Sequence, residues 1–284
     1  MAETVPLPAD GHVHSEWSWD APGGDMERTC ARAVQLGVPA VAFTEHVDVT
    51  RWLVVLEELR ADDHLRGFVA SDGTVVPAPL DVEGYLAAVE RCRDLFPSLR
   101  ILTGVELGEP HWYQSQVREL LSGGRFDRVL GSLHSLPVGT RFAKPRYLYR
   151  HRPADDVVRA YLAEVSHLIR SSDAFTVLAH LDYPLRYWPP SAGPLEVTVF
   201  EDEFRDTLGV LAASGRALEV NTRGPASEHL VAWWRAVGGS AVTFGSDAHD
   251  PIRLGRGFER AAAMVEAHGF RPGRHPHEPW TRIG

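Results

Sequence analysis

Short apolar runs alternate along the chain with longer segments in which apolar residues recur every three or four positions. Such runs are typical of buried strands, and the longer pattern is typical of amphipathic helices. Seven strands are predicted, at residues 9–14, 40–46, 100–106, 128–134, 175–180, 217–221 and 241–247. Helical segments separate them, so the chain is expected to repeat a strand–helix unit.

Capping residues indicate where several helices begin and end. Asp81 is predicted to cap a helix that Pro97 closes. Pro153 opens a second helix, and Ser227 caps a third. The apolar stripes are Met26, Cys30 and Val34 before Gly37; Val157, Tyr161, Val165 and Leu168; Phe200, Phe204, Leu208 and Leu211; and Leu230, Trp234 and Val237. Each stripe lies on one helix face, as expected for helices that pack against a sheet.

Strands that alternate with helices pair in parallel through right-handed crossovers, and a barrel is the closed form of this arrangement. The predicted fold is therefore an α/β barrel, a (β/α)7 barrel, with its active site at the carboxyl ends of the strands. Three connections at that end are longer than a barrel requires, at residues 47–80, 137–152 and 181–198. Residues 1–270 are expected to form one barrel domain, and residues 271–284 a C-terminal surface tail.

Composition narrows the classes of protein to consider. The 284 residues include 29 Lys and Arg against 38 Asp and Glu, a formal net charge of -9, which argues against binding along a nucleic acid backbone. The two cysteines, Cys30 and Cys92, are expected to be small core residues in a reducing compartment. No signal peptide is expected in residues 1–10, and no apolar stretch is long enough to span a bilayer. A cytoplasmic location without membrane contact is therefore predicted.

Imidazoles and carboxylates gather at the predicted strand ends. His12 and His14 lie two positions apart on the first strand, so their side chains share a face. The set comprises nine residues: His12, His14, Asp20, His46, Glu106, His134, His180, Asp247 and His249. Because the carboxyl ends of parallel strands meet at one mouth of a barrel, these nine side chains are expected to converge there.

Nine polar side chains gathered in one place need a counter-charge, which divalent cations supply. Mixed imidazole and carboxylate ligands suit zinc, iron or manganese better than calcium or magnesium. Nine ligands exceed the needs of one tetrahedral zinc ion, so two or three ions are predicted. The other eight histidines lack this placement and are expected to be ordinary core or surface residues: His64, His111, His151, His167, His229, His268, His275 and His277.

Several of these residues stand in short motifs. The motifs are Asp10-Gly11-His12-Val13-His14, Phe43-Thr44-Glu45-His46, Gly104-Val105-Glu106, Gly131-Ser132-Leu133-His134, Ala179-His180 and Gly245-Ser246-Asp247-Ala248-His249. In this order they resemble the signature blocks of the PHP (polymerase and histidinol phosphatase) superfamily, over residues 10–250. Within that superfamily the chain looks most like the monofunctional histidinol-phosphatase branch, because of Trp19-Asp20, Glu219-Val220-Asn221-Thr222 and Leu254-Gly255.

The resemblance implies a distorted (β/α)7 barrel that holds three divalent metal ions, which are zinc, iron or manganese. By analogy one ion is held by His12, His14, Glu106 and Asp247, the second by Asp20, His46 and His249, and the third by Glu106, His134 and His180, with Glu106 bridging. Asp20 stands where some family members have His. Asp247 and His249 are also candidate catalytic residues, together with Arg186.

The implied function is that of a metal-dependent phosphomonoesterase acting on a small phosphorylated metabolite. The expected reaction is hydrolysis of L-histidinol phosphate to L-histidinol and phosphate, in histidine biosynthesis, by attack of a metal-bound hydroxide. Two alternatives remain. One is another PHP phosphoesterase acting on nucleotides, cyclic phosphates or oligonucleotide ends, which the long 47–80 insertion keeps open. The other is a non-catalytic PHP-like binding module, which the nine competent ligand residues disfavour.

A cationic side chain is expected beside the metals, because a guanidinium matches two phosphate oxygens in one planar fork. Arg186 lies six residues after His180. Its position resembles that of a phosphate-binding arginine in the histidinol-phosphatase branch. Arg223, Arg141 and Lys144 are weaker candidates and are expected to be solvated loop charges.

Overall fold

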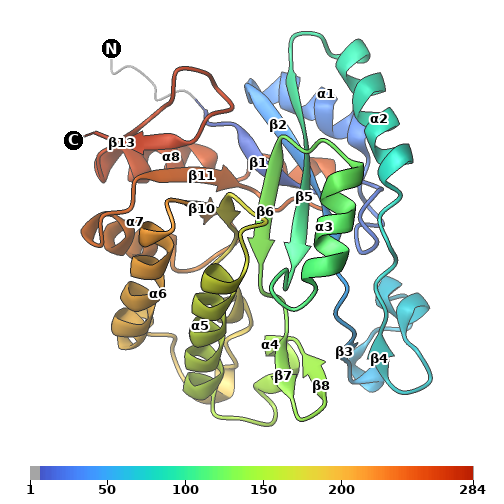
Figure 1. Cartoon of the computed structure of the whole chain (residues 1–284), viewed down its shortest axis with the longest axis vertical. Helices are drawn as coiled ribbons and strands as arrows, with labels where there is room; N and C mark the ends of the chain where they lie inside the picture. The colour runs from blue at the N-terminus through green and yellow to red at the C-terminus, as the bar shows by residue number, and fades with distance from the viewer. Residues whose placement is uncertain (1–6, 284) are drawn as a thin grey trace.

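A computed structural model describes residues 7–283, and a curled sheet of nine strands runs through its centre (Figure 1). Seven strands follow one another in parallel: β1 (Asp10–Val13), β2 (Ala40–Val47), β5 (Arg100–Gly108), β6 (Arg128–Ser132), β9 (Val177–Leu178), β10 (Ala217–Asn221) and β11 (Ala241–Gly245). The seven predicted strands and their order in a parallel α/β barrel are thus confirmed. Four of the strands end before the ligand-type residue that the prediction had included in them.

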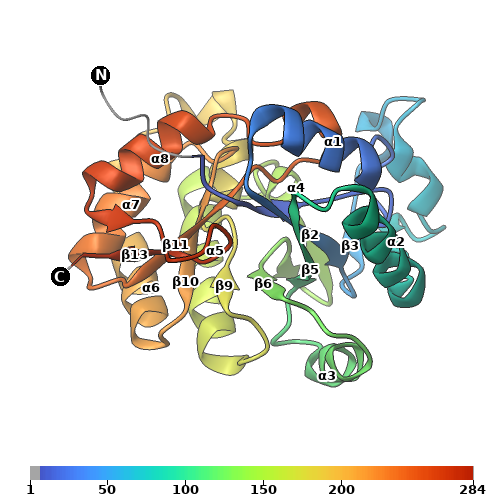
Figure 2. The same cartoon turned by 90° about the horizontal axis from the view of Figure 1, so that it is seen from above.

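Helices surround the strands, as Figure 2 shows from above. They are α1 (Met26–Leu36), α2 (Val82–Leu95), α3 (Gln114–Gly123), α4 (Pro145–Leu148), α5 (Ala154–Ser171), α6 (Glu201–Ala213), α7 (Ser227–Ala236) and α8 (Phe258–Ala267). On α5, for example, the predicted stripe from Val157 to Leu168 is buried. The helices therefore bury their apolar faces against the sheet, which is how a barrel of this class forms its core.

The barrel is distorted because it closes at one end only. At the mouth, Asp247 N donates to His12 O over 2.8 Å, and His14 N donates to Ala248 O over 2.9 Å. Toward the opposite end, the edge of β11 pairs with β13 (Trp280–Arg282), which in turn pairs with β12 (Phe270–Arg271). The first and last strands of the barrel therefore meet where the predicted ligands lie.

Two of the three predicted helix starts are confirmed, and one is wrong. The Asp81 carboxylate accepts from Gly84 N and begins α2, and α5 begins directly after Pro153, as expected. The prediction for Ser227 is wrong: Ser227 is the first residue of α7, and its hydroxyl donates to the carbonyl of Asn221 over 3.1 Å. Val34 is 47% exposed, because the buried face of α1 runs through Thr29 and Ala33 instead.

Two of the long connections pair with each other in a second, smaller sheet. Residues 47–80 contribute β3 (Trp52–Leu53) and β4 (Thr74–Val75). The connection after β6 contributes β7 (Leu136–Val138) and β8 (Arg141–Ala143), and β3 pairs in parallel with β8. In Figure 1 this sheet lies beyond the arrow tips of β5 and β6, at the mouth of the barrel. The third connection forms short 3-10 turns, including η3 (Tyr183–Tyr187).

The C-terminal segment differs from the surface tail that the sequence suggested for residues 271–284. Its strand β13 lengthens the main sheet, and Trp280 is buried with its ring 4.9 Å from that of Phe244. No helix within residues 7–283 is long and apolar enough to cross a membrane. The expectation that residues 1–10 hold no signal peptide falls largely on residues 1–6, which lie outside the described part of the chain.

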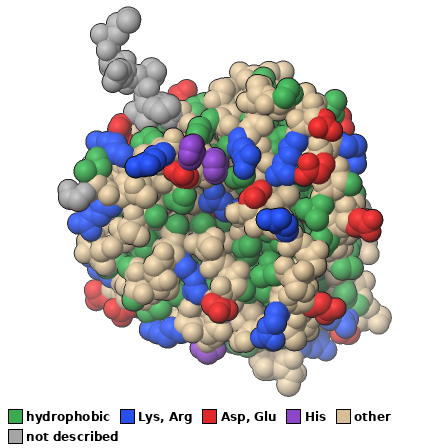
Figure 3. All heavy atoms as spheres, turned by 45° about the horizontal axis from the view of Figure 1, so that its top comes forward, with side chains coloured by type: hydrophobic (Ala, Val, Ile, Leu, Met, Phe, Trp, Pro, Cys, Tyr) green, Lys and Arg blue, Asp and Glu red, His purple; other side chains and the backbone are tan. Residues whose placement is uncertain are grey.

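Charged side chains of both signs are intermixed on the face that comes forward when the top of Figure 1 is tilted toward the viewer (Figure 3). That view takes in the top of Figure 1, where β5 and β6 begin, together with part of its front. It therefore shows no continuous basic surface.

Replacing Trp280 with Ala should lower the free energy of unfolding by about 3–5 kcal/mol, because a large buried ring is lost from the core. Chemical denaturation measures this change. Ile283 in the same segment is 53% exposed, so its replacement with Ala should change stability by less than about 0.5 kcal/mol. Equal effects of the two substitutions would contradict the assignment of β13 to the barrel wall.

Candidate metal centre

The predicted ligand residues meet at the closed mouth of the barrel. Four overlapping groups have ligand atoms within 4.8 Å of one another: His14, His46 and His249; His12, Glu106 and His180; His12, His14 and Asp247; and His46, Asp48 and His134. Eight of the nine predicted residues belong to these groups. The ninth, Asp20, has its Oδ1 3.5 Å from His46 Nε2 and 3.8 Å from His249 Nε2. The structure therefore brings all nine together.

Glu106 lies at the centre of this cluster with its side chain almost completely buried. Five imidazole nitrogens approach its carboxylate, at 3.1 Å (His12), 3.4 Å (His14), 3.2 Å (His46), 3.2 Å (His134) and 2.6 Å (His180). Ligand atoms of a tetrahedral zinc ion lie about 3.3 Å apart, since each lies about 2.0–2.1 Å from the metal. Four of the five distances are close to this value and suit ions bound between the carboxylate oxygens and the imidazoles, whereas the 2.6 Å to His180 is a hydrogen-bond distance.

Electrostatic interactions keep the central carboxylates ionised. Burial opposes the ionisation of Glu106, yet neighbouring imidazoles, His12 and His46 foremost, hold its pKa well below the usual value. Burial likewise opposes ionisation of Asp247, but the charges of Arg186 and His12 hold the pKa of that carboxyl well below its usual range. Burial together with the nearby imidazole of His46 lowers the pKa of His14. The neighbouring carboxylates instead raise the pKa of His12 and of His134 against the effect of burial. Ionised carboxylates and neutral imidazoles bind metal ions, so binding at these two imidazoles would release protons.

Several buried polar atoms in the cluster have no hydrogen-bond partner within residues 7–283. They include Asp20 Oδ1, His46 Nδ1 and His180 Nδ1. Buried polar groups are normally paired, so unpaired atoms in a polar site call for another partner. For Asp20 Oδ1, a divalent cation between it and the Nε2 atoms of His46 and His249 would be that partner. His46 Nδ1 lies on the other side of its ring, 3.2 Å from Glu106 Oε2. The donor set thus fits divalent metal ions.

Strained backbone accompanies the site. Among the described residues, the only non-glycine residues with a positive φ are His180 (φ 23°), Asp247 (φ 52°) and Glu109 (φ 48°). Such conformations cost about 1–3 kcal/mol each and persist where surrounding contacts enforce them. His180 N donates to Glu219 Oε2 over 2.8 Å, and Asp247 N is held by His12 O. The strain therefore falls at two of the predicted ligands.

Several buried acids near the ligands were not assigned a role from the sequence, among them Glu45, Asp48, Glu109 and Glu219. Asp48 follows His46 by two residues on an extended segment, so a shared face could have been inferred for it. Glu219 lies on β10, and its approach to His12 depends on where β10 sits relative to β1 across the barrel. No local sequence signal reports that distance.

Arg186 and Arg223 both reach the cluster. Arg186 Nη1 donates to Asp247 Oδ2 over 2.7 Å, and Arg223 Nη1 lies 3.1 Å from Asp247 Oδ1. Within the described part of the chain, Arg186 Nε and Nη2 are buried without a partner. By contrast, Arg141 donates to the carbonyl of Asp72 on the small sheet, and Lys144 Nζ lies 4.4 Å from the centre of the Trp52 ring. Arg186 therefore has free donors beside the predicted metal ligands.

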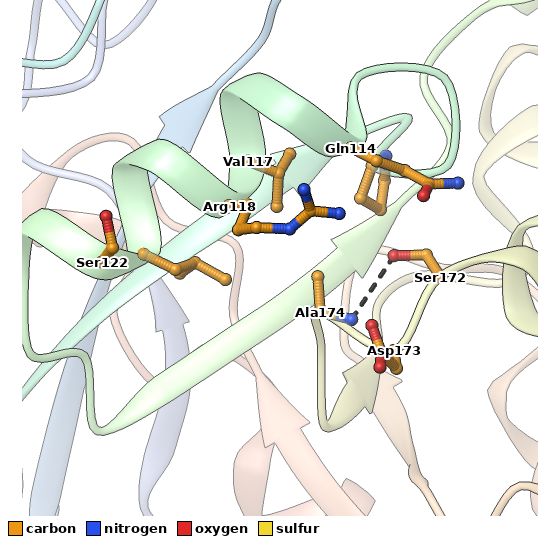
Figure 4. A pocket seen from close by; sticks show the side chains of 9 residues that line it. Gln114, Val117, Arg118, Ser122, Ser172, Asp173 and Ala174 are labelled. Atoms are coloured by element: carbon orange, nitrogen blue, oxygen red, sulfur yellow. Dashed lines mark hydrogen bonds between the residues drawn. The ribbon is translucent and has the colours of Figure 1, made fainter.

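A pocket of about 240 Å³ adjoins the cluster at Asp20. Its walls come from the small sheet, from the loop before α4 and from η3, and include Trp52, Lys144, Tyr183 and Tyr187. A separate cavity of about 350 Å³ lies between α3 and residues 172–174, where Arg118 and Gln114 face Asp173 and Ser172 (Figure 4). None of the nine predicted ligands lines that second cavity. The pocket at Asp20 is therefore placed to hold a molecule that reaches the metal ligands.

The eight histidines that the sequence set apart are absent from the four ligand groups found in residues 7–283. His111 is buried, and its Nε2 lies 2.8 Å from Glu164 Oε1 on α5. His64 Nε2 lies 2.8 Å from the carbonyl of Trp19, where it ties η2 (His64–Phe68) to the loop before α1. Both therefore have structural partners of their own.

A model of one protein family, described as the PHP domain, matches residues 10–223, which is most of the chain. The chain belongs to the PHP domain family. This match agrees with the resemblance inferred from the sequence motifs, which begin at the same residue.

Individual relatives of this PHP protein point to one branch of the family. A histidinol-phosphatase of Lactococcus lactis is 24% identical over 274 residues, covering 92% of this chain and 91% of the relative. A protein of Clostridium acetobutylicum named "Probable histidinol-phosphatase" is 27% identical over 199 residues, covering 68% of this chain and 76% of the relative. The crystal structure of the Lactococcus lactis histidinol phosphate phosphatase with zinc, L-histidinol and phosphate covers 93% of this chain and 95% of its own, with a TM-score of 0.75 and 22% identity. That likeness confirms the distorted barrel.

Replacing Glu106 with Gln should remove more than one metal ion per chain, because its two oxygens face different imidazoles. Replacing His249 with Ala should remove one, because its ring lies at the edge of the cluster beside Asp20. Elemental analysis of protein purified without chelators measures both. Equal losses in the two variants would contradict a bridging position for Glu106.

Proposed function

We propose that this PHP protein is a metal-dependent phosphomonoesterase that hydrolyses L-histidinol phosphate to L-histidinol and phosphate. The observation that carries the proposal is the buried cluster around Glu106, with the free donors of Arg186 beside it. The named relatives support the choice of substrate, since each match carries the name histidinol-phosphatase or its equivalent.

Three divalent ions, of zinc, iron or manganese, are proposed to occupy the cluster. His12, His14, Glu106 and Asp247 would hold one ion, Asp20, His46 and His249 the second, and Glu106, His134 and His180 the third. Bound there, the ions would lower the pKa of a water molecule toward neutrality and offset charge on the phosphoryl oxygens. The burial of Glu106 and of the imidazoles around it supports this assignment, because the cluster excludes competing solvent ligands.

The protein's own contribution is to hold and orient the phosphate. Arg186 Nη1 is anchored on Asp247, and its Nε and Nη2 are buried without a partner among the described residues, so these donors would bind phosphate oxygens at little entropic cost. Arg223 approaches the other oxygen of the same carboxylate and adds a second positive charge. Donors fixed in advance stabilise the charge that develops on phosphate oxygens in the transition state. Asp247, His249 and Arg186 are accordingly proposed as catalytic residues.

The pocket at Asp20 would receive the organic part of the substrate. Its volume of about 240 Å³ and its walls of Trp52, Tyr183 and Tyr187 suit a small molecule with a ring. The insertion 47–80 forms part of these walls rather than a wide groove. A small metabolite is therefore favoured over an oligonucleotide end, and a hydrolytic site over a non-catalytic binding module.

The purified protein should release phosphate from L-histidinol phosphate, and removal of its metals by a chelator should abolish this activity. Phosphate release from nucleotides and p-nitrophenol release from bis(p-nitrophenyl) phosphate are measured in parallel. Readdition of zinc, manganese or iron should restore turnover. Rapid hydrolysis of a nucleotide or cyclic phosphate with no hydrolysis of L-histidinol phosphate would identify the other PHP phosphoesterase function instead.

Replacing Arg186 with Ala should lower turnover by about a hundredfold or more, comparable to the loss of one strong transition-state donor. Metal content should be retained, because Arg186 is not a proposed ligand. Arg141→Ala is the matched control, since this exposed arginine donates to the carbonyl of Asp72 in the insertion, and its turnover should match the unmodified protein. Near-normal turnover in Arg186→Ala, with metals verified, would assign the phosphate-binding role to another cation.

A further inference from the structure

One buried acid outside the proposed ligand set holds His12. The Nδ1 of His12 donates to Glu219 Oε1 over 2.6 Å, while its Nε2 lies 3.1 Å from Glu106. The second oxygen of Glu219 accepts from His180 N and from Asn221 Nδ2, so the carboxylate cannot turn away. Space for it depends on Gly245, where a Cβ atom would overlap Glu219 Oε1. The absence of a side chain at Gly245 of β11 thus leaves room for the Glu219 carboxylate.

A second acid holds His134 in the same manner. The Nδ1 of His134 lies 3.2 Å from Asp48 Oδ1, and its Nε2 lies 3.2 Å from Glu106. The other oxygen of Asp48 accepts from Trp19 Nε1 over 3.1 Å. A Cβ atom on Gly108 would overlap Asp48 Oδ1, so this strand also leaves room for the carboxylate.

A hydroxyl takes the place of the carboxylate beside His14. Ser18 Oγ lies 2.9 Å from His14 Nδ1 and donates its own proton to Glu45 Oε2 over 2.5 Å. Because that proton is committed to Glu45, Ser18 accepts from His14, and Nδ1 carries the imidazole proton. The lone pair of His14 Nε2 is then directed into the cluster, where this atom lies 3.4 Å from Glu106 Oε2 and 3.0 Å from His12 Nε2.

The three arrangements share one geometry: each imidazole directs Nε2 inward to Glu106 and donates from Nδ1 outward to a buried acceptor. We propose that Glu219, Asp48 and the Ser18–Glu45 pair are positioning residues, which set the tautomer and orientation of His12, His134 and His14 for metal binding. An acceptor on Nδ1 also makes Nε2 a stronger ligand. This inference rests on the proposed metal centre and adds the residues that tune its affinity.

The experiment compares metal affinity among variants of the full-length protein. Metal-free protein is titrated with Zn²⁺ against a competing chromophoric chelator, and the absorption spectrum of the Co²⁺ form is recorded. In Glu219→Gln, Asp48→Asn and Ser18→Ala, the affinity for at least one ion should fall by about 10–100-fold. The Co²⁺ spectrum should change with it, since the orientation of a ligand changes. Ser18→Ala and Asp48→Asn keep the inference testable if Glu219→Gln does not fold.

Glu109→Gln provides the matched control. Glu109 is buried near the same strand ends, but its Oε1 accepts from the backbone of His134 and Ser135 rather than from an imidazole ring. Its variant should have a lower unfolding temperature without metal and unchanged metal affinity. Unchanged affinity in the three test variants, or an equal loss of affinity in Glu109→Gln, would overturn the inference. Hydrolysis of L-histidinol phosphate is assayed separately, so a protein that binds ions without this activity would count against the proposed function alone.

Discussion

The carboxylate of Glu106, buried among five imidazoles, is the interaction on which the rest of the site depends. An ionised carboxylate removed from water costs several kcal/mol unless charges and hydrogen bonds compensate it. Here the compensation comes from β1, β2, the ends of β6 and β9, and the Ser132 hydroxyl, which donates over 2.5 Å. Elements far apart in the sequence are thus held to one point, and divalent ions would complete the charge balance.

The way the barrel closes follows the same requirement. β1 and the segment after β11 join at the mouth through Asp247 N and His14 N, which brings His12 and His14 against Asp247. At the other end β13 pairs with the edge of β11. The distortion is therefore an opening at the end away from the site, while the functional end keeps first and last strands in contact.

Each connection at the mouth of the barrel supplies different residues of the site. The loop after β1 supplies Asp20 and Ser18, η3 supplies Arg186, and the small sheet formed by two insertions supplies Trp52 and the pocket wall. Asp48 links these parts, because it contacts His134 in the cluster and Trp19 beside the small sheet. A barrel with a common set of metal ligands can change its substrate through such loops, since they form the pocket without supplying most of the ligands.

Much of this molecule could be predicted from the sequence because the relevant signals are local. Apolar runs located the seven strands, and residues at the strand ends converge in any parallel barrel, so the nine ligand candidates followed without coordinates. Asp81 and Pro153 marked helix starts through contacts within one turn. The prediction for Ser227 failed because its hydroxyl donates to the carbonyl of Asn221 at the end of β10, and helix caps compete with such contacts.

The sequence by itself therefore determined the class of fold, the mouth where the site lies and the kinds of side chain that meet there. Only the tertiary structure decided the partners of those side chains: Glu219 beside His12, Asp48 beside His134, and Ser18 between His14 and Glu45. It also decided that two insertions pair as one sheet and that Trp280 joins the core. These contacts join segments far apart in the chain, and hydrophobic periodicity reports only which face of an element is buried, not what lies against it.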